Sequence, residues 1–221
     1  MSKLNKLNEK KQVSVATMVV TSILCLLPIA LGFILWNKLP KMIPQQYGWD
    51  DQANWSLPKP LGFILCPVLM VLINLILQLT LRLSKKPLND KIVAIICWLI
   101  PVLSVFVNSF LVLKPAGLKI SASNAVIPMV SIVFIMIGND MPKTEPNALV
   151  GIRAPWINNN PDVWTKTQRF GGFLFVVTGF LNLATSFTSS SRQVFIISIA
   201  ILMLVVLVYS LVLAAKTKNE Q

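Results

Sequence analysis

The chain has 221 residues, of which 55% are hydrophobic and 13% are charged, and its mean hydropathy is +0.70. A soluble domain carries about 25% charged residues, so this composition excludes an ordinary soluble globular protein. The net charge of +12 would suit nucleic acid, but basic residues that flank hydrophobic segments are attracted to anionic lipid headgroups. We therefore expect contact with a lipid bilayer and no direct contact with nucleic acid.

Six hydrophobic blocks follow one another along the chain. They are Val13–Trp36, Pro60–Leu81, Ile92–Leu113, Ala122–Ile137, Phe170–Phe187 and Val194–Ala215. Crossing the hydrocarbon core takes roughly 17–25 apolar residues, and the fourth block is the shortest. The first block has no small-x-small cleavage pattern, so we expect a retained helix. The pattern predicts an all-α, polytopic integral membrane protein with six transmembrane helices.

The blocks and the segments between them define the expected domains. These are a basic cytoplasmic tail (1–12), an N-terminal membrane domain (13–91) with an outer loop (37–59), a third helix with an outer loop (92–121), a second membrane domain (122–215) with an inner loop (138–169), and a cytoplasmic tail (216–221). With a cytoplasmic N-terminus, 14 of the 20 basic residues fall on inner segments. The positive-inside rule then places both termini in the cytoplasm of a multi-pass protein of the cell membrane.

The outer loop 37–59 is rich in proline and aromatic residues. Gly48 and Asp50–Asp51 predict a turn. The aromatic side chains combine apolar bodies with polar tips, which suits the headgroup layer. They either anchor the helix ends or form a small structured cap that meets an extracellular molecule. The candidate residues are Pro44, Gln46, Tyr47, Trp49, Asp50 and Trp55.

The hydrophobic blocks contain amides but no acidic residue, and the chain has no histidine. Asn74, Gln78, Asn108 and Asn182 either join helices by hydrogen bonds or line a path for a solute. The missing acid–base groups argue against an ion pump, an enzyme and a metal site. No cofactor motif is present. The three cysteines fall in different blocks, so we expect free thiols.

The inner loop 138–169 has the start signal of a helix. Asn160 can cap it, with Pro161 at its first position and Asp162 in its first turn. We predict an interfacial helix between the fourth and fifth transmembrane helices, leading into the fifth, with Trp156 and Trp164 as anchors. Arg153 and Arg169 are either only membrane-surface charges, or Asn147, Arg153 and Trp156 form a docking surface. That surface would face a cytosolic partner or the helices' own inner ends.

Both loops carry a resemblance to a known family. The segment Ile43–Lys59, with Pro44, Tyr47 and Asp50, looks like the small membrane domain of unknown function that commonly precedes SdpI domains. That domain usually carries a Pro-x-His-aromatic core, and Gln46 stands where its histidine is expected.

The inner loop resembles the signature of the SdpI family. The matching candidates are Asn139, Pro142, Lys143, Pro146, Asn147, Gly151, Arg153, Pro155, Trp156, Trp164, Lys166 and Arg169. The signature commonly has a histidine before the final arginine, and this chain has Gln168 there. With the six-block layout, the resemblance covers most of the chain and makes 122–215 an SdpI-like domain.

SdpI proteins give immunity against secreted sporulation-delaying toxins. The resemblance implies a bacterial membrane protein that resists a peptide toxin or bacteriocin by binding it, and that also tethers a cytosolic repressor. The alternative is a small transporter of the peptide or another solute. Glutamine keeps the hydrogen bonding of histidine but does not titrate. We favour a structural role for both glutamine positions.

Overall fold

The computed structural model describes residues 13–48, 50–84, 90–146 and 151–219. The chain divides after Ile120 into two compact units. Each unit is mostly helical, and each is described on its own below.

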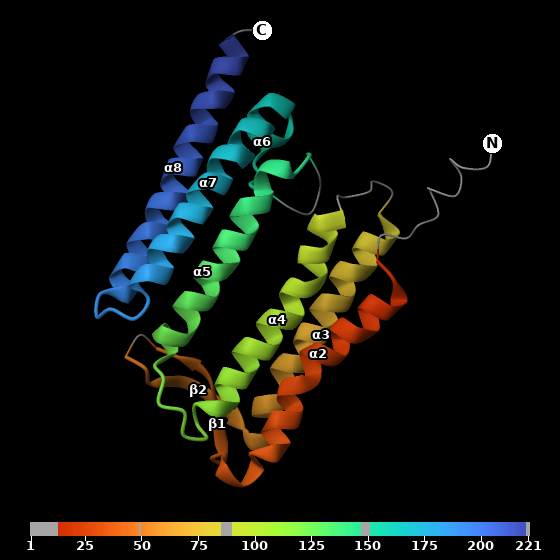
Figure 1. Ribbon diagram of the computed structural model, residues 1–221, viewed down its shortest axis with the longest axis vertical. Helices are drawn as coiled ribbons and strands as arrows, with labels where there is room; N and C mark the ends of the chain where they lie inside the picture. Colours follow the sequence, from red (N-terminus) through yellow and green to blue (C-terminus); the bar gives the residue numbers. More distant parts are fainter. Residues whose placement is uncertain (1–12, 49, 85–89, 147–150, 220–221) are drawn as a thin grey trace, which may run out of the picture. The chain divides into compact units, whose positions relative to one another are not determined.

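Unit 1 contains three long helices and a short hairpin (Figure 1). Its elements are α2 (Val15–Ile34), η1 (Trp36–Lys38), β1 (Met42–Tyr47), β2 (Ala53–Pro58), α3 (Lys59–Leu83) and α4 (Asp90–Leu113). The three helices contact one another pairwise. Ser14 caps α2 by accepting a hydrogen bond from the Thr17 backbone N–H at 3.0 Å. At the other end of the helices, Ile43 of the hairpin packs with Phe63 and Val112 in one buried cluster.

The hairpin corrects the expectation of an all-α chain. Strands β1 and β2 pair antiparallel, with Ile43 opposite Leu57 and Gln46 opposite Trp55. The pairing is irregular on both sides of Gln46. Pro44 lies in β1 although proline cannot donate to a ladder, because each strand of a two-stranded sheet has a free edge that tolerates it. The predicted turn is confirmed, since the Asp51 N–H bonds to the Gly48 carbonyl at 3.0 Å.

Unit 2 is built around one long central helix. Its elements are α5 (Ala122–Asp140), η2 (Met141–Lys143), α6 (Pro155–Asn158), α7 (Pro161–Thr185) and α8 (Ser191–Asn219). Figure 1 shows α7 between α5 and α8, and it contacts both. Glycines allow the backbones of α5 and α7 to meet: a Cβ atom on Gly172 would lie 2.6 Å from the Gly138 carbonyl oxygen.

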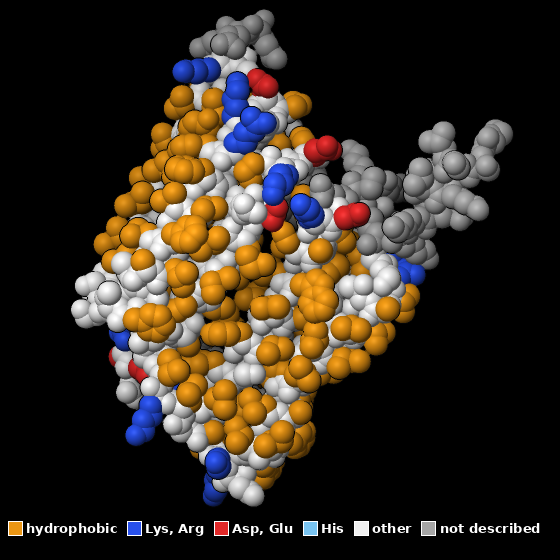
Figure 2. All heavy atoms as spheres, in the orientation of Figure 1, with side chains coloured by type: hydrophobic (Ala, Val, Ile, Leu, Met, Phe, Trp, Pro, Cys, Tyr) orange, Lys and Arg blue, Asp and Glu red, His pale blue; other side chains and the backbone are white. Residues whose placement is uncertain are grey.

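Five of the described helices are long and apolar enough to cross a membrane. They are α2, α3, α4, α5 extended through η2 to Lys143, and α8 from Ser191 to Thr217. The sixth predicted span lies in α7, which does not meet this criterion and whose first turns carry Asp162, Lys166 and Arg169. Figure 2 shows hydrophobic side chains along the helices and charged side chains towards their ends. A membrane protein with several spans accounts for this distribution.

The predicted cap at Asn160 is confirmed. Its side-chain oxygen accepts hydrogen bonds from the backbone N–H groups of Asp162 and Val163, at 3.0 and 3.2 Å. The helix that follows begins with Pro161 and runs without a break into the apolar part of α7. The short helix α6 (Pro155–Asn158) precedes it. Because helix propagation costs less than a new nucleus, the polar turns simply continue into the apolar ones.

Three of the four amides within the helices bond to a neighbouring helix. Asn74 and Gln78 of α3 both donate to the Thr21 hydroxyl of α2, at 3.1 and 2.8 Å. Asn108 bonds to Ser104 within α4, and Ser198 of α8 donates to Asn182 of α7 at 2.9 Å. These contacts favour the role of joining helices. The three cysteines are free, and Cys25 and Cys97 are buried.

Candidate functional site

Gln168 fastens the inner loop to α7. Its side-chain Nε2 donates to the Ile152 carbonyl at 2.8 Å, and its Oε1 accepts from the Ile152 N–H at 2.9 Å. The Gln168 side chain is 0% exposed, and the two bonds that it makes to Ile152 are partly buried. A neutral imidazole also has one donor and one acceptor, but they point apart around the ring. One primary amide can therefore make a pair of bonds that one histidine ring cannot.

Trp164 forms the second attachment, one helical turn before Gln168. Its indole N–H donates to the Thr144 carbonyl at 2.9 Å, and the ring is 1% exposed. Trp164 packs with Ile157 and Val163 in the buried cluster of the inner loop. The two side chains thus hold both described ends of the loop, before and after the undescribed residues 147–150, against one face of α7.

Gly151 lies where these two attachments meet. Its φ of +119° is a conformation that favours glycine. A Cβ atom there would also lie 2.9 Å from the Gln168 Oε1 and 3.1 Å from the Trp164 ring. The glycine of the signature is therefore required by the packing of the loop.

The other signature residues divide between packed and exposed positions. The Trp156 N–H donates to the Ser210 hydroxyl of α8 at 3.2 Å, so this residue joins α6 to α8. Ion pairs within their own segments involve Lys143 with Asp140 at 2.7 Å and Lys166 with Asp162 at 3.2 Å. Exposed members are Asn139, Pro142, Lys143, Pro146, Arg153, Pro155, Lys166 and Arg169. Asn147 lies outside the described residues.

Lys114, which directly follows α4, contacts the outer hairpin and the segment after α4 through its ammonium group. Its Nζ lies 2.5 Å from the Asp51 carboxylate and 3.0 Å from the Ile120 carbonyl oxygen. It also lies 4.8 Å from the centre of the Tyr47 ring, at cation–π distance. Burial, followed by the negative charge of Asp51, raises the pKa of Tyr47 to about 12. This arrangement ties the turn of the hairpin to the end of α4.

The two neighbouring glutamines of the hairpin differ in their surroundings: Gln45 bonds to α3, and Gln46 is exposed. Gln45 donates to the Gly62 carbonyl at 2.8 Å and accepts a hydrogen bond from the Cys66 thiol. Gln46, at the position where the resembling domain has histidine, is exposed, as are Asp50 and Trp55. Pro44 is half-buried. Trp49 lies outside the described residues.

Three structural contributors were missed by the sequence reasoning: Gln45, Lys114 and Thr144. Their partners lie far away in the sequence, so no local spacing signals them. Among the described residues, no group of three His, Cys, Asp or Glu side chains is placed to hold a metal ion. The arrangement of both loops is one of hydrogen bonds and packing.

These features define a small multi-pass helical membrane protein with a folded loop in each unit. Residues 143–212 match the model of the SdpI/YfhL protein family, and residues 23–71 match the Domain of unknown function (DUF1648). The chain is 26% identical over 190 residues to the immunity protein SdpI of Bacillus subtilis (strain 168). The aligned region covers 86% of this chain and 90% of that protein. No solved structure matches the chain. The predicted resemblance to the SdpI family is confirmed.

We expect Gln168→Ala to loosen the inner loop. The Ile152 N–H and carbonyl would both lose their partner, and each of these partly buried bonds contributes about 0.5–1.5 kcal/mol. Hydrogen exchange at the Ile152 amide should accelerate markedly, and the protein in detergent should unfold at a lower temperature. Thr165→Ala is the control, because Thr165 is exposed on the same helix and bonds only to the Pro161 carbonyl. Equally slow hydrogen exchange at the Ile152 amide in both variants would contradict the role of Gln168 in holding the loop.

We expect Tyr47 to ionise near pH 12 in the folded protein. Its ordinary pKa is 10.0. A raised folded pKa means that its contribution to stability is complete below pH 10 and is lost as the pH rises from 10 to 12. Tyrosinate absorbance should be followed in Tyr209→Phe, which leaves Tyr47 as the single tyrosine of the two in the chain. Titration at pH 10 in the folded state would contradict the burial of this ring beside Asp51.

Proposed function

We propose that this protein protects a bacterial cell against a membrane-active peptide toxin. The main support for this proposal is the similarity to an immunity protein over 86% of the chain. The match to the SdpI/YfhL model includes α6, α7 and most of α8, the elements that hold the inner loop. The proposed location is the cell membrane, with α7 as a sixth span and both termini in the cytoplasm, as the distribution of basic residues favours.

The proposed mode of action is binding without chemistry. Gln168 makes two hydrogen bonds to one backbone residue, which is a structural use of the position where relatives commonly have histidine. Neither a glutamine nor the tryptophan beside it supplies a proton at neutral pH. An immunity protein that works by occupying a peptide or preventing its assembly needs surface complementarity and no general base.

The exposed face of the outer hairpin is the proposed contact for the peptide. Trp55 is 49% exposed and lies opposite Gln46 in the strand register. Large aromatic side chains with an apolar body contribute strongly to binding sites. Tyr47, by contrast, packs on Phe110 at 6.1 Å between ring centres. We therefore assign recognition to Gln46, Asp50 and Trp55, and support of the hairpin to Tyr47.

The exposed basic side chains of the inner loop are the proposed docking surface for a cytosolic repressor. Arg153 and Arg169 are exposed, and Lys143 and Lys166 are exposed beside their acidic partners. Such a surface suits an acidic patch on a partner. Trp156 is packed against α8 and belongs to the support of this surface, not to its contact face.

We expect Trp55→Ala to abolish most of the protection that the wild-type chain gives. The chain should be expressed in a sensitive Gram-positive host that is challenged with a panel of membrane-active peptides, at matched membrane abundance. The minimum inhibitory concentration should fall by about tenfold, in line with the loss of an aromatic contact worth ≥1–2 kcal/mol. Trp98→Ala is the control, because Trp98 is 46% exposed in the apolar helix α4.

Three results would count against this proposal. Equal protection by Trp55→Ala and wild type would remove the hairpin from recognition. Loss of protection in Asn108→Ala or Asn182→Ala, with Trp55→Ala unaffected, would favour a transporter that uses the amides within the helices. Absence of protection by the wild type against every peptide would contradict the immunity role itself.

A further inference from the structure

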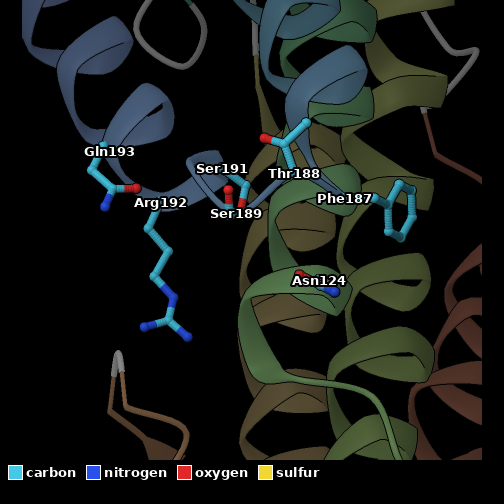
Figure 3. A pocket seen from close by; sticks show the side chains of 7 residues that line it. All are labelled: Asn124, Phe187, Thr188, Ser189, Ser191, Arg192 and Gln193. Atoms are coloured by element: carbon cyan, nitrogen blue, oxygen red, sulfur yellow. The ribbon is translucent and has the colours of Figure 1, made fainter.

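A polar hollow lies where α7 turns into α8. It has a volume of about 430 Å³ and is lined by Asn124, Phe187, Thr188, Ser189, Ser191, Arg192 and Gln193 (Figure 3). This volume is within the roughly 300–1,000 Å³ of small-molecule sites. None of the lining residues belongs to the inner loop or the hairpin, so the hollow is separate from both candidate surfaces.

The lining offers hydrogen-bond donors and one positive charge. Figure 3 shows Arg192 on one side of the Ser189 and Ser191 hydroxyls and Asn124 on the other. Hydroxyl and amide groups donate hydrogen bonds, and a guanidinium has five N–H donors. No Asp or Glu lines the hollow. Such a set of groups suits an anion and disfavours a cation.

Arg192 is held in place by one bond and keeps further donors. Its Nε–H donates to the Ser123 hydroxyl at 3.0 Å, which links the start of α8 to the start of α5. The Nη atoms have no hydrogen-bond or ion-pair partner among the described residues of the chain. A guanidinium fixed at one edge in this way presents its other edge in the planar geometry that matches phosphate oxygens.

Two helix beginnings add to the positive potential. Asn124 lies in the first turn of α5, and Ser191, Arg192 and Gln193 begin α8. The positive ends of both helix dipoles lie at the hollow together with the Arg192 charge, and they oppose the negative end of α7 at Thr185. Both helices are long and apolar enough to cross a membrane, so their ends are expected at the depth of lipid headgroups. Phe187, at 75% exposed, supplies an apolar side chain at the rim.

We propose that this hollow binds a phosphate group, which an anionic phospholipid headgroup supplies. Arg192 pairs with the phosphate oxygens through its Nη atoms, and Asn124, Ser189 and Ser191 donate to the remaining oxygens. Phe187 contacts the apolar part of the same lipid. The bound lipid joins the starts of α5 and α8 and so stabilises unit 2. The site does not depend on the proposed immunity role.

The test uses the full chain in neutral detergent and native mass spectrometry. Phosphatidylglycerol is titrated against a diacylglycerol of the same acyl chains, which lacks the phosphate. We expect preferential binding of phosphatidylglycerol, weakened about tenfold in Arg192→Gln by the loss of a charge-assisted pair. Lys216→Gln is the matched control, because it removes one exposed charge near the other end of α8. Its affinity should stay within about twofold of the wild type.

A competition with inorganic phosphate identifies the source of the phosphate group, and two further variants test the site if Arg192→Gln does not fold. Inorganic phosphate alone should not displace the lipid; displacement that depends on Arg192 would assign the hollow to free phosphate. If Arg192→Gln does not fold, Asn124→Ala and Ser189→Ala should still weaken binding of phosphatidylglycerol. Equal binding of the two lipids by the wild type, or equal weakening in Arg192→Gln and Lys216→Gln, would overturn the proposal.

Discussion

The structure depends on the pairing, within the protein, of most of the polar groups that are removed from water. In a bilayer the cost of an unpaired backbone group is several kcal/mol. Side-chain amides in this protein therefore bond to backbone groups and to neighbouring helices. Gln168 pairs with both backbone groups of Ile152, and Asn74 and Gln78 converge on Thr21. The inner loop is built on the first of these connections, and the packing of α2 against α3 includes the second.

The same need for pairing explains the opposite outcomes at the two glutamine positions where the resemblance led us to expect histidine. Gln168 is buried and acts on the backbone, while Gln46 is exposed on the hairpin next to Trp55 in register. A buried glutamine is neutral at every pH, so it adds no charge to a low-dielectric site. The inner position is structural in this chain, and the outer position is available for contact with another molecule. This arrangement supports the proposal that the protein acts by binding.

The sequence could predict features that depend on nearby residues. Asn160, Pro161 and Asp162 are adjacent, so their cap was readable, and the long apolar blocks indicated five helices that the structure supports as spans. The hairpin was missed because Pro44 and Pro58 weaken the strand pattern, and only pairing with a second strand reveals it. The continuity of α7 was missed because its polar start looks like a surface segment.

Features that depend on tertiary contacts could not be predicted. Lys114 is about sixty residues from Asp51 in the sequence, and Thr144 is 20 residues from Trp164. The signature pattern identified Gly151 and Gln168 as important positions, but only the fold shows that they touch. The signature residues of the inner loop could be recognised in the sequence. Which of them are packed and which are exposed could not.

The most direct test of the account is the site of contact with the peptide in living cells. A photo-crosslinking amino acid would replace Trp55 in one strain and Trp98 in another, and both strains would be exposed to a peptide against which the wild-type chain protects. Binding at the hairpin should give a covalent adduct with the peptide from position 55 and none from position 98. Adducts from position 98 alone, or from neither position while protection persists, would contradict immunity by binding at this surface.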